Sequence, residues 1–270
     1  MRPAVTLLLL LLLAACGTGS DEPDAAAPST GSSTASSSPS VPPSPTEEPW
    51  QTLDGPLGRC GPQPPDLSDT RLRYAVLRDP AVGRIPSVTL GSGRTVAVLL
   101  HQTDGNGLCG WLDPATRLVA GAGITALAVD LCQYGDAACR PDRTETDAVA
   151  VAVRHAREQL HARRVVLVGA SMGGSVALMS AARLDGVDAA VDLSGPVEWP
   201  GLEAVRGGRA LRVPVLVAMA HDEGPEEVRG ARSIAAHAPA GSVFVPAPVG
   251  HGYDLVDPLG EQVRDFVAGR

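Results

Sequence analysis

The feature that most constrains the fold is a five-residue stretch, Gly169–Gly173, with the sequence G-A-S-M-G. An apolar, mostly β-branched run, Val165–Val168, precedes it, and small and apolar residues follow it. This context predicts a short buried strand, a tight turn with Ser171 at its apex, and a helix that begins at Met172. The glycines on either side suit such a turn, because its strained backbone leaves no room for larger side chains. The sequence therefore predicts a serine at a strand-to-helix turn, facing the positive end of the helix.

The first fifteen residues have the pattern of an export signal. Arg2 provides a positive charge, and the apolar run Leu7–Leu13 is too short to cross a bilayer comfortably. The following Leu13-Ala14-Ala15-Cys16 resembles the bacterial lipobox, in which the cysteine is lipidated and becomes the mature N-terminus. We therefore expect residues 1–15 to be a lipoprotein signal peptide and Cys16 to anchor the protein on the extracytoplasmic face of the cell membrane. An ordinary secretory signal cleaved near Ala15 is the alternative, and it also implies export.

A compositional change then separates two regions. Residues 16–49 are dominated by Ser, Pro, Thr, Ala and acidic residues and contain a single Val and no other large aliphatic residue. Such a segment cannot bury enough apolar surface to offset its conformational entropy, so we expect a disordered tether. Residues 50–270 are long enough for one domain with a sizeable core. The net charge of −8, with no basic cluster, argues against nucleic acid as a partner.

Four cysteines remain besides Cys16, and an even number in an exported protein favours disulfides. Of the three pairings, we favour Cys132–Cys139, which closes a short loop, together with Cys60–Cys109, which ties the N-terminal region to the domain. A metal site on the first pair is the alternative, but no matching set of Cys and His residues accompanies it. We therefore expect neither a metal nor another cofactor.

Strand and helix patterns alternate from about residue 70 to the end of the chain. This alternation predicts an α/β fold with a mostly parallel central sheet of about eight strands and helices on both faces. Only about twenty residues separate the strand that ends near Ser194 from the next one, which leaves room for one short helix and no cap domain. We expect strands over 72–77, 84–90, 95–100, 124–129, 165–168, 189–193, 213–218 and 242–245, and helices over 114–122, 146–161, from 172, 226–237 and 257–268. Thr144, with Asp147 three residues later, should cap the second of these helices, and Asp257 should cap the last.

A nucleophilic serine needs a base and a group that orients the base. We expect His251 to be the base, because a glycine on each side lets its loop project the imidazole between the last strand and the last helix. The acid should follow the strand over 213–218. Asp222 is our first choice there, with Glu223 as a close competitor and Asp192 third, since Asp192 lies inside an apolar strand.

The same chemistry needs amides that face the developing oxyanion. The amide of Met172, directly after the serine, is one candidate. The second should come from the loop after the strand over 95–100, through the backbone N–H of Gln102 or Thr103. We expect His101 to shape this loop, and Asp130, at the end of the next strand, to line the same opening.

From about residue 70 to the end, the chain resembles the α/β-hydrolases, in particular the small capless esterase and dienelactone hydrolase-like branches. The resemblance rests on Leu99-Leu100-His101-Gln102, on the segment Val168–Gly174, on the Asp222 loop and on Gly250-His251-Gly252. It implies a Ser171–His251–Asp222 triad and hydrolysis through an acyl-enzyme. Two departures are His-Gln in place of the usual His-Gly, and a serine where dienelactone hydrolases use cysteine, so their substrate does not carry over.

Together these expectations describe a lipid-anchored, extracytoplasmic serine hydrolase, assumed to be monomeric, that cleaves an ester or thioester. Without a cap its site should be open and should favour small or flexible molecules. A peptidase or amidase would use the same triad, as would an acyltransferase. A binding lipoprotein that keeps the fold without the chemistry is the alternative from a different class.

Overall fold

The computed structural model describes residues 50–64, 67, 71–104, 106–205 and 208–270. The expected signal peptide with Cys16, and the expected tether, lie outside these residues. Across the described ranges, no helix combines the length and the apolar character that a membrane span requires.

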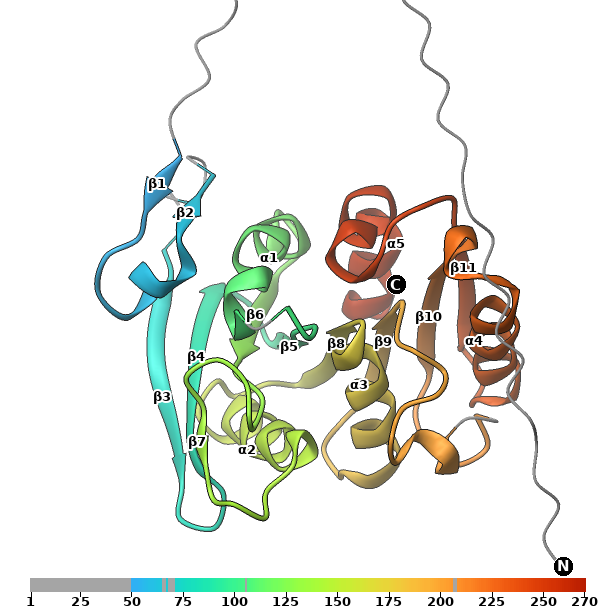
Figure 1. Ribbon diagram of the computed structural model, residues 1–270, viewed down its shortest axis with the longest axis horizontal. Helices are drawn as coiled ribbons and strands as arrows, with labels where there is room; N and C mark the ends of the chain where they lie inside the picture. The colour runs from blue at the N-terminus through green and yellow to red at the C-terminus, as the bar shows by residue number, and fades with distance from the viewer. Residues whose placement is uncertain (1–49, 65–66, 68–70, 105, 206–207) are drawn as a thin grey trace, which may run out of the picture. The chain divides into compact units, whose positions relative to one another are not determined.

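A nine-stranded sheet forms the centre of the domain (Figure 1). Six parallel strands follow the order β11-β10-β9-β8-β5-β6, and β4 and β3 extend the sheet in antiparallel pairings beyond β6. The two-residue strand β7 pairs with β4 and was not expected from the sequence. The mostly parallel sheet of about eight strands is thus confirmed. The strands are β3 (Arg73–Asp79), β4 (Gly83–Gly91), β5 (Thr95–Leu100), β6 (Ile124–Val129), β7 (Ala138–Cys139), β8 (Arg164–Ala170), β9 (Ala189–Leu193), β10 (Val215–Ala220) and β11 (Val243–Ala247).

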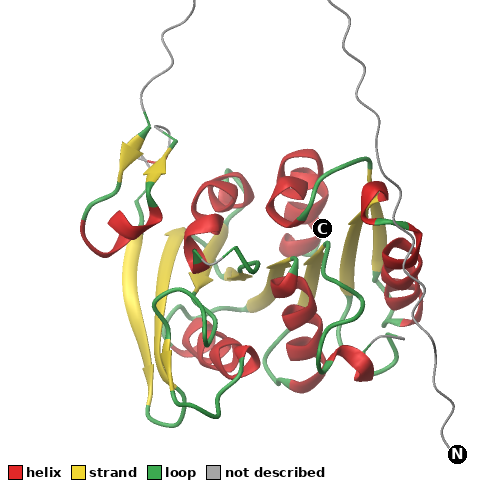
Figure 2. Cartoon of the chain, viewed as in Figure 1, coloured by secondary structure: helices red, strands yellow, loops and turns green. Residues whose placement is uncertain are grey.

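Helices cover both faces of the sheet, as expected (Figure 2). On one face lie α1 (Leu112–Val119) and α5 (Val256–Ala268), which pack against each other. On the other face lie α2 (Glu145–Glu158), α3 (Met172–Arg183) and α4 (Pro225–His237). The right-handed crossovers of a parallel sheet require such helices, because each connection must return across a face.

The strands bury side chains on both sides, which explains why they are continuously apolar in sequence. In β5, Val96, Val98 and Leu100 belong to the core on the α2 and α3 side, whereas Ala97 and Leu99 belong to the core on the α1 and α5 side. All five are fully buried. The sheet therefore separates two apolar cores, and its inner strands are buried on both faces.

Two helix starts test the expected capping residues. Thr144 caps α2, and its N–H donates to the Asp147 carboxylate at 2.8 Å, which confirms the expected pairing. The expectation that Asp257 caps α5 is wrong, because the cap is Leu255 and Asp257 lies within the first turn. A carboxylate in that turn still interacts favourably with the positive end of the helix.

An N-terminal arm, residues 50–63, precedes the main sheet. It consists of a two-stranded sheet, β1 (Gln51–Thr52) and β2 (Pro62–Gln63), with a 3-10 helix, Gly55–Cys60, between them. The disulfide Cys60–Cys109 ties this arm to the domain, and Cys132–Cys139 closes the short loop before β7. Both pairings are those that the sequence favoured.

The two outermost strands of the main sheet differ in character from the inner ones. β11 carries Pro246, which has no backbone N–H, and its Val243 is exposed. β3, at the other end, alternates exposed residues such as Arg73 and Arg78 with partly buried ones. Both edge strands therefore contain exposed residues along their length, whereas the inner strands are almost entirely buried.

Candidate active site

Ser171 lies at the junction of β8 and α3 in a strained conformation. It directly follows the last residue of β8 and caps α3, with φ 51° and ψ −122°. Non-glycine residues rarely adopt a positive φ, so the surrounding structure must hold it there. The Ser171 N–H donates to Leu193 O at 2.8 Å, and the Gly174 N–H donates to Ser171 O at 2.7 Å. The turn is thus fixed on both sides of the serine.

Close backbone contacts explain the two glycines that flank the serine. A Cβ on Gly169 would lie 1.9 Å from the carbonyl oxygen of Gly173, and one on Gly173 would lie 2.1 Å from the carbonyl oxygen of Leu100. Neither position can hold a side chain without moving the backbone. The first turn of α3 therefore rests directly on the ends of β8 and β5, as the expectation of a tight turn requires.

His251 lies in the loop between β11 and α5. Its neighbours Gly250 and Gly252 have φ 113° and φ 56°, values that favour glycine, which supports the reason for choosing this histidine. A Cβ on Gly252 would lie 3.4 Å from the Cβ of Ala170, the residue before Ser171. The loop that carries His251 thus packs against the strand end that carries the serine.

The carboxylate that contacts His251 is Glu223. The Nδ1 of His251 is hydrogen-bonded to Glu223 Oε1. Asp222 is exposed and forms no hydrogen bond or ion pair within the described part of the chain, although it lines the same pocket. The preference for Asp222 over its competitor therefore does not agree with the geometry. Both residues lie in a 3-10 helix, His221–Glu223, where successive side chains point about 120° apart, so only one of them faces the imidazole.

This contact determines the state of the imidazole. When Nδ1–H donates to the Glu223 carboxylate, Nε2 keeps its lone pair and can accept a proton. The Ser171 hydroxyl is partly exposed and has no hydrogen-bond partner among the described residues. A hydroxyl, an imidazole and a carboxylate thus come from the carboxyl ends of β8, β11 and β10.

The candidate oxyanion amides differ in their availability. Within the described chain, the N–H groups of Met172 and Gly173 have no acceptor, as is usual in the first turn of a helix. The Gln102 N–H donates to Tyr253 Oη at 3.2 Å. Thr103 is exposed, and no described residue accepts from its N–H. Of the two expected loop amides, that of Thr103 thus has no acceptor among the described residues, whereas that of Gln102 is engaged with Tyr253.

His101 has the structural role that the sequence analysis expected. Its Nε2 accepts from the Leu131 N–H at 3.0 Å, so Nδ1 carries the proton and donates to Gln102 O at 2.8 Å. Burial lowers the pKa of the His101 imidazole, because the charged form would lose its hydration. The neutral ring thus links the ends of β5 and β6.

Asp130 does not line the opening, contrary to expectation. Its side chain is completely buried and accepts hydrogen bonds from Arg59 Nη2 at 2.7 Å, Leu108 N at 2.8 Å and Asp136 N at 2.9 Å. The sequence carried no signal for the pairing with Arg59, because the two residues are 71 positions apart.

Tyr253 is a residue of the site that sequence reasoning missed. Besides accepting from Gln102, it packs edge-on against Trp111, with ring centroids 5.1 Å apart. Burial raises the pKa of the Tyr253 hydroxyl, so it stays protonated. Its position two residues after His251, in the same loop, was the available signal.

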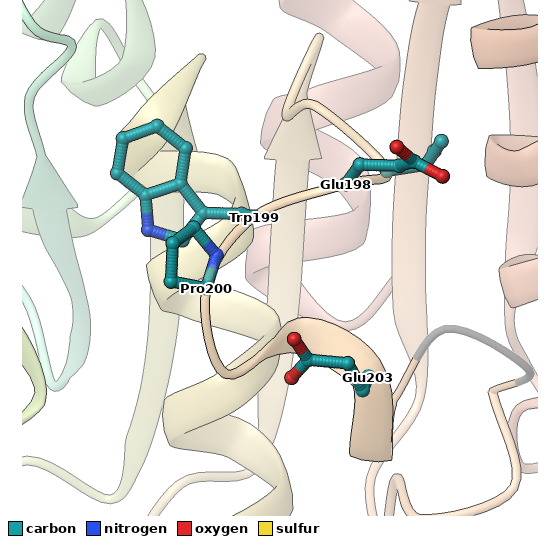
Figure 3. Close-up of a pocket in the computed structure, with 5 residues that line it drawn as sticks. Glu198, Trp199, Pro200 and Glu203 are labelled. Carbon is teal, nitrogen blue, oxygen red and sulfur yellow. The ribbon is translucent and has the colours of Figure 1, made fainter. Parts of the chain in front are cut away.

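Two hollows lie in loops that follow the central strands, and only the first is lined by His251. One, of about 370 Å³, is lined by His251 with Val249 and the three carboxylates Asp222, Glu223 and Asp254. The other, of about 350 Å³, lies in the loop after β9, and Figure 3 shows Trp199 and two acidic residues of its lining. The described part of this loop contains one 3-10 turn, Leu202–Ala204, which agrees with the expected lack of a cap. No set of His, Cys, Asp and Glu residues that could hold a metal ion occurs in the described ranges.

Solved structures with the same fold include three enzymes of different substrate classes. An esterase from Pyrococcus furiosus matches with a TM-score of 0.61 and 14% identity over 82% of this chain and 95% of that one. A dienelactone hydrolase from Anabaena variabilis matches with a TM-score of 0.56 and 14% identity over 74% of this chain and 96% of that one. A proline iminopeptidase from Mycobacterium smegmatis matches with a TM-score of 0.53 and 12% identity over 73% of this chain and 97% of that one. The sequence matches no protein-family profile and no curated protein.

These likenesses, together with the strand order and the turn at Ser171, show that the chain has the α/β-hydrolase fold. The resemblance stated from the sequence is thus confirmed for the fold.

Asp192, the third candidate for the acid, is buried in β9, the strand next to the one that precedes Ser171. It lies in β9 opposite Gly169 of β8, and its Oδ1 accepts from the Gly195 N–H at 2.7 Å. Burial raises the pKa of the Asp192 carboxyl to about 7, and the nearby carboxylate of Glu227 adds to the effect. No contact joins it to His251 within the described residues.

Asp192→Asn should make the protein more stable at alkaline pH. A carboxyl with a raised pKa stabilises the native state below its unfolded pKa of about 4, and this contribution is lost as pH rises through about 7. Asparagine keeps the acceptor for Gly195 and cannot ionise. Urea unfolding should therefore show a gain of roughly 1–3 kcal/mol over the wild type at pH 8 that shrinks toward pH 4. The exposed Asp222→Asn serves as a control, and an Asp192→Asn difference that does not vary with pH would contradict the prediction.

Proposed function

We propose that the protein is a serine hydrolase that cleaves a carboxylic ester or thioester through an acyl-enzyme on Ser171. The observation that carries the proposal is the strained Ser171 at the β8–α3 junction, beside a loop whose His251 is held by Glu223. Strained backbone of this kind costs about 1–3 kcal/mol and persists where it serves a function. It presents the hydroxyl at the positive end of α3.

In the acylation step, Ser171 Oγ attacks the carbonyl carbon of the substrate while Nε2 of His251 accepts the hydroxyl proton. Glu223 keeps Nδ1 protonated and stabilises the imidazolium that forms. The negative charge on the former carbonyl oxygen is stabilised by the N–H of Met172 and by that of Thr103. Gln102 supports this loop through Tyr253 and does not donate to the oxyanion.

The intermediate then collapses, and the bond to the leaving alcohol or thiol breaks as His251 returns the proton to it. In the second step water attacks the acyl carbon while His251 accepts its proton, and the bond to Ser171 Oγ then breaks as His251 returns the proton to that oxygen. The products are the carboxylic acid and free Ser171. No cofactor is needed for this sequence of steps.

The choice of an ester rests on the openness of the site and on the esterase among the structural neighbours. A peptidase or amidase is the second candidate, and the proline iminopeptidase among the neighbours favours it. An acyltransferase would differ only in the acceptor of the second step. A binding protein without activity would keep the fold but would have no need for the strained serine.

The proposal predicts covalent labelling of Ser171 by a fluorophosphonate probe. Labelling should disappear in Ser171→Ala and fall by at least about 10⁴-fold in His251→Ala, because the hydroxyl is a weak nucleophile without its base. The wild type should release p-nitrophenol from p-nitrophenyl esters faster than p-nitroaniline from the matching amides. A folded wild type that never labels would refute the hydrolase and favour the binding protein, and faster amide cleavage would favour the peptidase.

Glu223→Gln and Asp222→Asn form a matched pair that tests the acid. Glutamine cannot hold the imidazole in the required protonation state, so kcat should fall by roughly 10³- to 10⁴-fold. Asp222→Asn should change kcat less than about threefold, because Asp222 is exposed and forms no hydrogen bond or ion pair with a described residue. Steady-state kinetics on one ester give both values. The opposite ranking would return the role to Asp222.

We further propose that residues 1–15 are a signal peptide, that Cys16 carries a lipid, and that residues 16–49 tether the domain to the extracytoplasmic face of the membrane. The lipobox-like sequence before Cys16 and the composition of the tether support this. In a bacterial host, Cys16→Ser should move the protein from the membrane fraction to the soluble fraction. An unchanged membrane fraction would exclude the lipid anchor.

A further inference from the structure

The loop between β5 and α1 is described over residues 102–104 and 106–111, and groups outside the loop hold these residues. At its start, the Gln102 N–H donates to Tyr253 Oη. Near its end, the Leu108 N–H donates to Asp130 Oδ1 at 2.8 Å. This loop supplies Thr103, so its position sets the place of one proposed oxyanion donor.

Asp130 brings a negative charge into the core beneath this loop. It follows β6, and its side chain has no exposure to solvent. Two loops approach it so closely that a Cβ on Gly107 would lie 2.2 Å from its Oδ1, and one on Gly135 would lie 2.4 Å from the same atom. A buried carboxylate is strongly destabilising unless a cation pairs with it.

Arg59 of the N-terminal arm supplies that cation and also holds the loop itself. Its Nη2 pairs with Asp130 Oδ2 at 2.7 Å, and its Nη1 donates to the carbonyl oxygen of Asn106 at 3.1 Å. Its Nε lies 2.9 Å from Asp136 Oδ2, in the loop after β6. The planar guanidinium thus joins the arm to the loop at 102–111 and to the loop after β6.

The next residue of the arm is bonded covalently to the same loop. Cys60 forms its disulfide with Cys109, three residues after Asn106. Around it, Leu57 of the arm shares one apolar core with Leu108 and Trp111. Charge, covalent bond and apolar packing therefore all act between the arm and one segment of the loop.

The geometry points to the arm as a positioning element of the catalytic site: Arg59 and the Cys60–Cys109 disulfide fix the loop that carries the Thr103 oxyanion donor. This inference rests on the proposed function. Gly110 connects the same loop to the residues around His251, because a Cβ on Gly110 would lie 2.4 Å from the ring of Tyr253, two residues after His251. Loss of the arm contacts should therefore shift the oxyanion donor relative to His251.

Two variants test this role: Arg59→Gln, and Cys60→Ser combined with Cys109→Ser. Each should lower kcat on a p-nitrophenyl ester by about 10- to 100-fold while KM changes less than about threefold. The reason is that a misplaced donor stabilises the transition state less but hardly affects the binding of the substrate. Amide hydrogen exchange should become faster in residues 102–111 and stay unchanged in α3. If the double serine variant does not fold, Arg59→Gln carries the test.

Arg157→Gln is the matched control. Arg157 also forms an ion pair, with Asp188, and donates to backbone carbonyls, those of Gly186 and Ala162 among them. It lies at the amino ends of the parallel strands, whereas the site lies at their carboxyl ends. Its variant should lose stability without losing kcat, measured at a temperature where both proteins are folded.

The two readouts separate the inference from the function on which it rests. An active wild type, with Arg59→Gln unchanged in kcat or in loop exchange, would overturn the positioning role alone. An equal loss of kcat in Arg157→Gln would also overturn it, since the effect would then be one of general stability. A wild type that neither labels nor hydrolyses esters would overturn the proposed function, and the catalytic role of the arm with it.

Discussion

The contact of the first turn of α3 with the ends of β8 and β5 is the constraint on which the rest of the site depends. Backbone touches backbone there, since neither Gly169 nor Gly173 has space for a single methyl group. This close packing holds Ser171 at its positive φ at the start of α3, where the first amides of the helix have no acceptor among the described residues. One packing requirement thus positions the hydroxyl and one of the proposed oxyanion donors together, before any other part of the site is considered.

The remaining groups depend on contacts that are distant in sequence. His251 and Glu223 meet because the carboxyl ends of parallel strands share one edge of the sheet. The loop after β5 is held by buried Asp130, which accepts from the Leu108 N–H and pairs with Arg59. Local backbone packing therefore positions Ser171 and the Met172 amide. The other groups of the site are positioned by side chains from elements that are distant in the sequence.

Features encoded by neighbouring residues could be predicted from the sequence, and features decided by three-dimensional contact could not. The turn at Ser171, the buried strands and the capping of α2 by Thr144 follow from local pattern. Glu223 rather than Asp222 faces His251 because of the direction of a 3-10 turn, which composition does not reveal. The burial of Asp130 depends on an arginine in an arm whose strands are only two residues long, too short for any periodic signal.

The edges of the sheet have a consequence for association between molecules. An exposed strand offers unpaired N–H and C=O groups to which another chain can add, and such addition leads to aggregation. Pro246 removes one donor from β11, and Arg73 and Arg78 place charges along β3. Both ends of the sheet are thus poor templates for a further strand, so edge-to-edge strand addition between domains is disfavoured at either end.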